Sequence, residues 1–549
     1  MENKEPEIII ENETDNLLDK FETPTSSAKP AKKKKSGAKA LIISLIAALV
    51  LGGVVCLLIF LPQNNEITDK LSDGTSVKTG VNSNKEWQAE VKTDKNGKIK
   101  VNGSGSFFSK VPADITKMEL KNSGGNLTIN ANTKKTKTKE TDPKTGETTE
   151  ETGETEYTIV GFETLELQTG APDEVANACS NLEFKSVSDA DASDHLADYG
   201  LDSPKAEAKV YFSDGTTATF KIGNDAPQNL GTYVMFGSGK EVYLCEKDAV
   251  KPFSFKITDL ISLTINNSAS DESSGEFKSL KLNDISISQN KEKDCIQNTY
   301  VLDDGKFADD NEASQVTGAI RGLYAESVEA VNPDSEQLKK LGLSSPKAHI
   351  KAVYPDIIVD LIASKPDSKG KCFLMETEGN IVYKIASASI PWVKTSREKL
   401  TSKYVLNANL SGLSKMSVTA DGKTTDFDIK TTVSKTTDDK GEETESTETV
   451  AKYKGKELDQ GYFQTFFDNA SMLKYEEANV NAGGTPKLTI KYTYSKSRKA
   501  DTLTFRKSGN AYAAYLNGKA IGTVYRSYIE QLCNQPDQII KDKEVKSFW

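Results

Sequence analysis

The chain has 549 residues, of which 27% are charged and 8% aromatic, and its formal net charge is −10. This length exceeds one ordinary core and fits about three or four domains. Residues 1–61 contain eight lysines and eight acidic residues, so the whole net charge lies on residues 62–549. A polyanionic partner such as nucleic acid is therefore disfavoured, because phosphate contacts need a basic surface.

The first expected element is a disordered cytoplasmic tail, residues 1–39, since a polar and acidic segment with few apolar residues cannot bury a core. A transmembrane helix follows at residues 40–61. Fifteen of these 22 residues are Leu, Ile, Val or Phe, and none is charged. At about 1.5 Å per residue, a helix of this length spans a hydrocarbon core of about 30 Å.

The flanks of this apolar segment predict its orientation. Six lysines between Lys29 and Lys39 precede it without an acidic residue, and the positive-inside rule keeps such a flank cytoplasmic. Residues 62–549 are then exported. A cleaved signal peptide and a lipoprotein that uses Cys56 are alternatives, but no A-x-A site follows the segment and six apolar residues follow Cys56. Residues 62–106, which include Trp87, are expected to be a polar tether.

Three markers then recur in the same order, which indicates an internal repeat. The prolines of the Ser/Thr-Pro-Lys marker are spaced by 142 and 140 residues, and the Val-Tyr pairs by 140 and 142. A third marker, with apolar residues at positions one, four and six, begins at Ile115, Leu260 and Leu413. The prolines of the first marker are Pro204, Pro346 and Pro486. The pairs of the second marker are Val242-Tyr243, Val382-Tyr383 and Val524-Tyr525.

Each copy has the same expected plan of a hairpin, a third strand, a helix and a second hairpin. Period-two alternation on either side of Asp214-Gly215 and Asp421-Gly422 indicates hairpins. The helices are indicated by apolar stripes, one in each copy: Val175, Cys179 and Leu182; Val316, Ile320 and Leu323; and Phe463, Phe466, Ala470 and Leu473. We therefore expect an α+β class of three repeated modules, each with antiparallel hairpins and one or two packed helices. The expected modules are residues 107–256, 257–401 and 402–549.

Two polar tracts, residues 133–156 and 434–449, lie after the second strand of the first and third copies. Neither tract contains an apolar side chain of the aliphatic or aromatic kind, and the shorter counterpart in the second copy runs near Gln289–Gln297. Insertions at one topological point are typical of a loop tip. We favour a mobile solvated loop at both places, and the alternative is a binding arm.

Residue types that carry chemistry are scarce. There are six cysteines with no CxxC pair, which is neither a disulfide framework nor a zinc signature. The only two histidines, His195 and His349, fall at positions expected on the surface, which disfavours histidine-based catalysis. HExxH, GxSxG, Walker and GxGxxG motifs do not occur. Several of the five cysteines outside the apolar segment are expected in cores; the five are Cys179, Cys245, Cys295, Cys372 and Cys533.

Carboxylate and aromatic sites remain open. Asp189-x-Asp191-x-Ser193-Asp194 resembles the start of a calcium loop, but it lacks the glycine and glutamate of that loop. Asp303-Asp304-Gly305 and Asp309-Asp310-Asn311 are explained by turn and cap roles. A glycosidase acid pair is not excluded, and no spacing singles one out. The three tryptophans are scattered and do not form the row of aromatic side chains that could bind a glycan. Tyr492 and Tyr494 are expected in the core. We assign no catalytic, cofactor-binding or metal-binding residue.

With these markers in place, the chain resembles the bacterial domain-of-unknown-function family 4340. The resemblance rests on Gly200-Leu-x-x-Pro204, Asp214-Gly215, Ile222-Gly223 with Gly231-Thr-Tyr233, and Val242-Tyr243-Leu244. It is clearest over residues 181–265, partial over 322–400 and faint in the third copy. It implies an N-terminal membrane segment, a repeated extracytoplasmic part and a gene neighbourhood with gliding-type ABC transporters.

Three functions follow as hypotheses. The first is a non-enzymatic, membrane-anchored extracytoplasmic protein that serves an ABC-type export system and contacts its permease. The second is a cell-envelope module that binds wall polymer or a surface protein. The third is an envelope hydrolase that uses carboxylates. The expected partners are the lipid bilayer and possible envelope proteins, with no cofactor and no nucleic acid.

Overall fold

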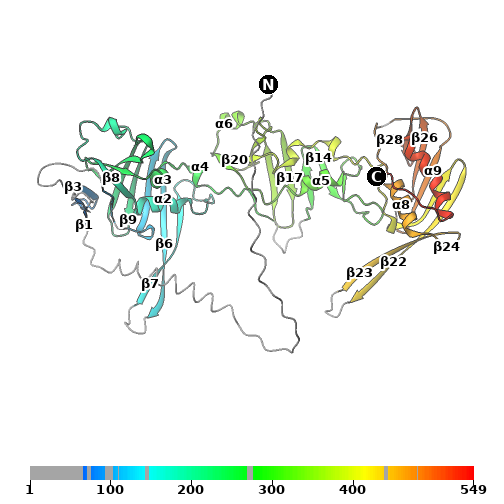
Figure 1. The fold of residues 1–549 in the computed structure, drawn as a ribbon, viewed down its shortest axis with the longest axis horizontal. Coiled ribbons are helices and arrows are strands. Elements are labelled where there is room, and N and C mark those ends of the chain that lie inside the picture. Colours follow the sequence, from blue (N-terminus) through cyan, green and yellow to red (C-terminus); the bar gives the residue numbers. More distant parts are fainter. Residues whose placement is uncertain are drawn as a thin grey trace, which may run out of the picture. The chain divides into compact units, whose positions relative to one another are not determined.

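The computed structural model describes residues 66–70, 76–92, 103–108, 110–141, 148–268, 276–437, 443–478, 480–496 and 498–549. Most of this part of the chain forms three large antiparallel β-sheets with a few short helices (Figure 1). The fold is therefore richer in strands than the predicted α+β class. In this part of the chain no helix is long and apolar enough to cross a membrane. The predicted tail and transmembrane helix, residues 1–61, lie outside the described residues.

The first large sheet has nine strands in the order β4-β8-β12-β11-β10-β9-β5-β6-β7. Helix α2 (Ala171–Ser180) packs on this sheet. The short helices α3 (Lys247–Val250) and α4 (Ile257–Leu260) come after its last strand in the chain. The strands are β4 (Gly105–Ser106), β5 (Ile115–Asn122), β6 (Gly125–Thr141), β7 (Thr148–Ile159), β8 (Glu183–Asp189), β9 (Ala206–Phe212), β10 (Thr217–Asp225), β11 (Thr232–Phe236) and β12 (Val242–Cys245).

The second and third sheets have eight strands each, in the orders β15-β14-β13-β17-β18-β19-β20-β16 and β24-β23-β22-β21-β25-β26-β27-β28. The second sheet contains β13 (Ser279–Leu282), β14 (Ile285–Gln289), β15 (Tyr300–Leu302), β16 (Ser327–Val331), β17 (Ala348–Val353), β18 (Ile358–Ala363), β19 (Lys371–Glu376) and β20 (Ile381–Ala386). The third contains β21 (Leu413–Ala420), β22 (Lys423–Thr437), β23 (Glu443–Tyr453), β24 (Lys456–Glu457), β25 (Leu488–Tyr494), β26 (Asp501–Ser508), β27 (Ala511–Leu516) and β28 (Lys519–Tyr525).

One strand order is shared by the three sheets. In each sheet the opening strand lies at the centre, between its hairpin partner and the first strand of the second hairpin. The first two sheets add a further strand, β8 or β16, beside the Val-Tyr strand. In the third sheet the described residues of the corresponding chain form no strand, and Ala478 makes an isolated bridge with Gly522. The Ser/Thr-Pro-Lys markers all stand directly before the first strand of the second hairpin: β9, β17 and β25.

Alternation explains why each sheet buries one face. In β9 the residues Ala206, Ala208, Val210 and Phe212 are buried, whereas the residues between them are partly exposed. Gly215 has φ of 81° at the turn into β10, a conformation that glycine adopts at little cost. The helices that cover the buried faces are α2 in the first sheet, α5 (Asp310–Thr317) in the second, and α8 (Gln460–Ser471) and α9 (Arg526–Ile540) in the third, whereas α6 (Ser335–Lys340) has no buried residue and contributes Leu338 to a small separate cluster.

Two details of the predicted plan were wrong. The apolar marker that begins at Leu260 does not form the opening strand of the second sheet, because it continues from α4 into the connection before that sheet. The opening strand is β13 instead, where Leu280 and Leu282 are buried. In the second copy the predicted helical stripe also continues past the helix: α5 ends at Thr317, and Ile320 and Leu323 are buried beyond it.

The predicted tether is partly folded. Within residues 62–106 the structure contains β1 (Glu66–Lys70), β2 (Ser76–Val81) and β3 (Trp87–Lys92), and β2 pairs with β3 over its whole length. Trp87 is 5% exposed and belongs to the first core, and its indole N–H donates to the hydroxyl of Thr216 at 3.1 Å. Alternating Val77, Thr79 and the facing Ala89 are buried as well. The apolar faces of these few residues explain why the segment packs.

The described parts of the two polar tracts are strands and not loops. In the first sheet β6 and β7 remain paired from Ile129 and Ile159 to Thr141 and Thr148, and in the third sheet β22 and β23 remain paired as far as Thr437 and Glu443. Figure 1 shows both pairs extending beyond the rest of their sheets. We call residues 133–141 with 148–156 the first arm and residues 434–437 with 443–449 the third arm.

Threonine content and charge pairing account for the arms. Threonine is β-branched and favours extended backbone, even where no core is available. Cross-strand pairs add to this preference. Lys435 bonds Glu445 at 2.7 Å in the third arm, and Thr431 and Thr449 share a hydroxyl hydrogen bond of 3.1 Å at its root. Lys134 and Glu156 form the same kind of pair in the first arm.

Trp87 provides a test of whether residues 76–92 belong to the first folded unit. Trp87→Ala removes a buried aromatic side chain, which costs about 3–5 kcal/mol, and leaves the Thr216 hydroxyl without this donor. Amide hydrogen exchange measured by mass spectrometry should accelerate in β9 and β10 and stay unchanged in β25 and β26. Trp549→Ala, at a side chain that is 56% exposed, is the control and should change neither. Unchanged exchange in β9 and β10 would contradict the packing.

Candidate functional site

The two histidines each bond an aspartate. His195 Nε2 lies 2.6 Å from Asp189 Oδ2, and the hydroxyl of Tyr199 donates to the same oxygen at 2.9 Å. His349 on β17 lies 2.6 Å from Asp360 Oδ1 on the paired strand β18. Both imidazoles are 44% exposed, as expected from the sequence. The His195 contact stabilises a turn, and the His349 contact links two paired strands.

The aspartate pattern that resembled a calcium loop is held by the protein's own donors. Asp189 accepts the backbone N–H of Asp191 at 2.9 Å, and Asp191 accepts the hydroxyl of Ser193 at 2.6 Å. Lys240 donates to the other oxygen of Asp191 at 2.6 Å. In the described part of the chain no group of three or more His, Cys, Asp or Glu side chains is arranged to hold a metal ion.

Electrostatics in this turn favour the charged forms. The hydrogen bond from Lys240 is the main reason that the pKa of Asp191 falls to about 2. Partial burial raises the pKa of Asp189, but the hydrogen bonds from Asp191 N–H, His195 and Tyr199 outweigh it and the pKa is lowered. The hydrogen bond to Asp189 raises the pKa of His195 above its ordinary value. These shifts stabilise a surface turn.

The remaining predicted carboxylates have cap and turn roles. Asp309 is the N-cap of α5, where it accepts the backbone N–H groups of Asn311 and Glu312 at 3.1 Å each. Gly305 has φ of 77° in the turn that Asp303 begins. Asp303 also accepts two hydrogen bonds from the guanidinium of Arg397, at 2.7 and 3.2 Å, which lower its pKa.

The thiols are also in structural positions. Four of the five cysteines in the described residues are buried and the fifth, Cys533, is half-buried. Burial raises the pKa of Cys372 and of Cys533 to about 11, and that of Cys179 and Cys245 further. Such thiols hold few thiolate groups near neutral pH, and the thiolate is the reactive form. Tyr492 and Tyr494 are buried in the third core, as expected.

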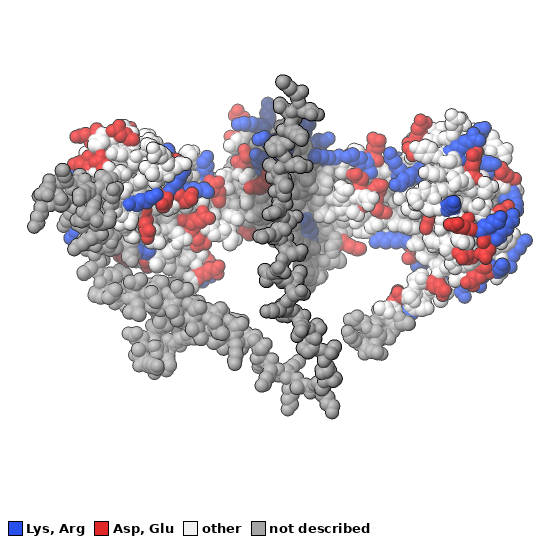
Figure 2. Space-filling model, viewed as in Figure 1, with Lys and Arg blue, Asp and Glu red and all other residues white. Residues whose placement is uncertain are grey.

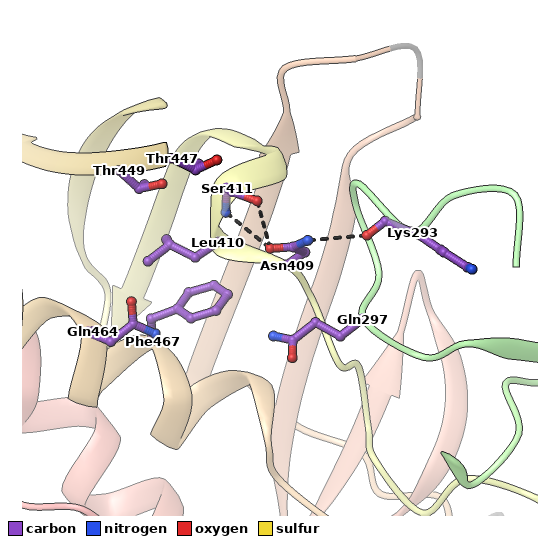
Figure 3. A pocket seen from close by; sticks show the side chains of 9 residues that line it. All are labelled: Lys293, Gln297, Asn409, Leu410, Ser411, Thr447, Thr449, Gln464 and Phe467. Carbon is purple, nitrogen blue, oxygen red and sulfur yellow. Dashed lines mark hydrogen bonds between the residues drawn. The ribbon is translucent and has the colours of Figure 1, made fainter. Parts of the chain in front are cut away.

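A cavity of about 470 Å³ lies at the root of the third arm. Its walls come from β23, from α8, from the 3₁₀ helix η6 (Leu410–Gly412) with the residue before it, and from the loop after β14. Figure 3 shows the nine lining side chains: Lys293, Gln297, Asn409, Leu410, Ser411, Thr447, Thr449, Gln464 and Phe467. Hydroxyl and amide groups predominate among them, and a lysine is the single charged residue.

Hydrogen bonds fix one wall of this cavity. Asn409 Oδ1 accepts the N–H and the hydroxyl of Ser411, and Asn409 Nδ2 donates to the carbonyl of Lys293 at 3.2 Å (Figure 3). Gln297 Nε2 donates to the carbonyl of Ala408 at 2.8 Å. The loop after β14 is therefore joined to the segment before β21 by side-chain bonds as well as by the bridge between Ile296 and Ala408.

Sequence reasoning missed this cavity because its walls come from distant segments. The loop near Gln289–Gln297 was predicted only as the short counterpart of the arms. One signal was present: Cys295 and Ile296 are apolar within a polar stretch, and both are buried in the third core. The chemistry of the lining groups, which are hydrogen-bond donors and acceptors without a carboxylate or an imidazole, suits binding better than catalysis.

Charge is mixed on the surface. On the face shown in Figure 2, acidic and basic side chains are interspersed over the described residues. Ion pairs between them include Lys247 with Asp225 at 2.8 Å and Lys423 with Asp537 at 2.6 Å. Exposed pairs of this kind contribute little stability each, and their sum keeps a large surface soluble.

The His195 contact generates a prediction about pH. Because its pKa is raised in the folded chain, the imidazolium–carboxylate contact stabilises the turn below the ordinary histidine pKa, and this stabilisation is lost as pH rises through the raised pKa. A nuclear magnetic resonance titration of the isotopically labelled histidines should place the His195 pKa above 6.5. Asp189→Asn should lower it toward that value. Asp191→Asn, which removes no bond to the imidazole, is the control. An unchanged pKa in Asp189→Asn would refute the contact.

Comparisons with known proteins add a family but no activity. A model described as "Domain of unknown function (DUF4340)" matches residues 158–306 and 304–479. The first match runs from the end of β7 to just after β15, so the repeat of this model is offset from the sheets and joins the later strands of one to the first strands of the next. No curated protein matches the chain.

Two solved structures of the Trypanosoma rangeli sialidase were also found. One is 10% identical and covers 84% of this chain and 89% of the sialidase, with a TM-score of 0.07. The other, a complex with sialic acid, is 9% identical and covers 85% and 91%, with a TM-score of 0.08. At these TM-scores the likeness says nothing about the fold or activity of this chain. The family matches, in contrast, together cover residues 158–479, more than half of the chain, and the chain therefore belongs to the DUF4340 family, a domain of unknown function.

Proposed function

We propose that this chain is a non-enzymatic, membrane-anchored extracytoplasmic scaffold that serves an ABC-type export system. The observation that carries the proposal is that the chemically reactive side chains of the repeated sheets have structural roles. Histidines, thiols and carboxylates hold turns, caps and cores together, whereas the hydroxyl- and amide-lined cavity and the arms present binding groups to solvent.

Repetition supports a scaffold. Three sheets with one strand order, each with its own hydrophobic cluster, give a chain several separate surfaces of similar construction. A binding protein gains from such surfaces, because contacts at several modules act together and raise the effective concentration of each.

The membrane anchor and the contact with a transporter are proposed from the sequence. The uncharged segment 40–61 and the lysines before it favour a single helix with residues 62–549 outside the cytoplasm. The contact with a permease follows from the resemblance stated above. A module that binds cell-envelope polymer or a surface protein is the second candidate, and the cavity lined by hydroxyl and amide groups favours it, because such groups pair with the hydroxyls of a glycan.

Cross-linking in intact cells tests the first candidate. The tagged full chain should recover an ABC permease and its ATPase after gentle solubilisation, as identified by mass spectrometry. A tagged chain of residues 1–61 alone is the matched control and should recover neither, which would place the contact in residues 62–549. Recovery of wall-associated protein or glycan without any transporter subunit would refute the export role and favour the envelope-binding candidate.

A further inference from the structure

The outer edge of β23 is the strongest unexplained feature of the described residues. β24 covers only its root, where Lys452 and Tyr453 pair with Glu457 and Lys456. From Glu443 to Val450, β23 has β22 on one side, and among the described residues no strand pairs with its other side. An exposed edge of this length presents a row of backbone donors and acceptors to other chains.

Hydrogen bonds at the root show which residues face outward. The N–H of Ala451 donates to Gln460 Oε1 at 2.8 Å, and its carbonyl accepts from Leu458 N–H at 3.1 Å and from Gln460 Nε2 at 3.3 Å. Ala451 therefore points its backbone groups away from β22. Outward and inward residues alternate along an antiparallel strand, so Thr449, Thr447 and Glu445 share this outward direction.

The pairing across the arm agrees with this assignment. Outward residues of β23 form non-hydrogen-bonded pairs with β22, in which side chains come closest. Thr449 lies opposite Thr431 and Glu445 opposite Lys435, and the two pairs make the side-chain bonds of 3.1 and 2.7 Å described above. The Gln460 side chain thus occupies, at Ala451, the place that a neighbouring strand would occupy further out.

The cavity lies on the face of β23 to which the side chains of Thr447 and Thr449 point. The side chains of Thr447 and Thr449 share one face of β23 and line the cavity, together with Gln464 of α8 (Figure 3). The η6 wall of the cavity is bonded to β22, because the hydroxyl of Thr431 donates to the carbonyl of Ser411 at 2.9 Å, so the cavity lies over the root of the arm. A strand added to the outer edge of β23 would direct alternate side chains over the cavity.

The charge of β23 indicates which kind of partner could pair with its open edge. Residues 443–451 include three glutamates, Glu443, Glu445 and Glu448, and no lysine or arginine. Antiparallel addition of a second copy of this edge would bring glutamates close to glutamates, which is unfavourable. The edge strand of the first arm has the same character, since residues 148–159 include four glutamates and no basic residue.

We propose that the outer edge of β23 and the adjoining cavity bind an extended segment of a partner polypeptide by strand addition. Lysine or arginine side chains of the segment lie on the face of β23 that carries Glu448, and uncharged side chains lie on the opposite face, over the cavity. Backbone hydrogen bonds to Glu445, Thr447 and Thr449 supply affinity, and the charged and cavity contacts supply specificity. This inference goes beyond the proposed function and does not require a transporter.

A labelled synthetic peptide of alternating threonine and lysine is the probe, and its fluorescence polarisation is measured with the full chain in detergent micelles. Thr447→Pro removes an outward N–H and leaves the ladder with β22 intact, because proline is tolerated at an edge position of this kind. We expect this variant to bind the probe about tenfold more weakly, since a strand-addition bond is lost and the ring obstructs pairing.

Thr447→Val is the matched control, because it keeps the backbone N–H and the shape of the side chain, and it should bind the probe more tightly than Thr447→Pro. A peptide of alternating threonine and glutamate should bind about tenfold more weakly than the lysine peptide, and the variant Glu448→Lys should reverse this preference. Hydrogen exchange of β22 should be the same in all variants, which separates loss of binding from loss of folding.

Three results would overturn the proposal. The first is equal binding of the lysine peptide to Thr447→Pro and Thr447→Val. The second is equal binding of the lysine and glutamate peptides to the unchanged chain. The third is self-association of the full chain, measured by analytical ultracentrifugation, that Thr447→Pro abolishes, since a second copy would then be the occupant. None of these results depends on whether a permease is recovered from cells.

Discussion

Each sheet depends on one pairing between strands that are distant in sequence. The central strand bonds its hairpin partner on one side and, on the other, the first strand of the second hairpin. Met118 thus pairs with Val210, Leu280 with Ala352, and Met416 with Tyr492. Closing the long intervening chain costs conformational entropy, and the buried face that the two hairpins complete together offsets that cost. Without this pairing, each sheet would separate into two smaller groups of three to six strands, and neither group would complete the buried face.

The parts of this architecture that repeat locally could be predicted from the sequence. Alternation on both sides of Asp214-Gly215 is a short-range signal, and it located β9 and β10 correctly. The apolar stripe of Phe463 and Phe466 likewise located α8. The arms could not be predicted, because a tract without apolar residues shows no hydrophobic period, and its strand pairing rests on threonine propensity and on cross-strand pairs. The packing of β2 and β3 was missed because a small number of apolar residues carries it, among them Val77, Trp87 and Ala89.

The candidate site was the least predictable part for a related reason. Its walls are contributed by β23, α8 and two connecting segments, and no spacing in one segment encodes their meeting. The outward direction of Thr447 follows only from the hydrogen bonds of Gln460 at Ala451, which depend on the tertiary position of α8. A sequence pattern places a residue on a strand and a face, whereas the identity of a strand's neighbours is a property of the whole sheet.

The second copy shows how the same topological point can serve a different purpose. Where the first and third copies extend an arm, the second has a short loop whose Cys295 and Ile296 are buried in the third core. A loop can be buried only if its backbone groups are satisfied. Asn290 Nδ2 donates to the carbonyls of Ile296 and Asn298 at 3.0 and 2.7 Å, and Asn298 Nδ2 donates to the carbonyl of Ala308 at 2.9 Å. Two asparagines therefore supply donors that a longer hairpin would have supplied from a partner strand. An arm at this point would carry its polar groups outward and leave the apolar surface near Ala408 exposed, so the short form joins consecutive repeats, while the long forms remain open to other chains.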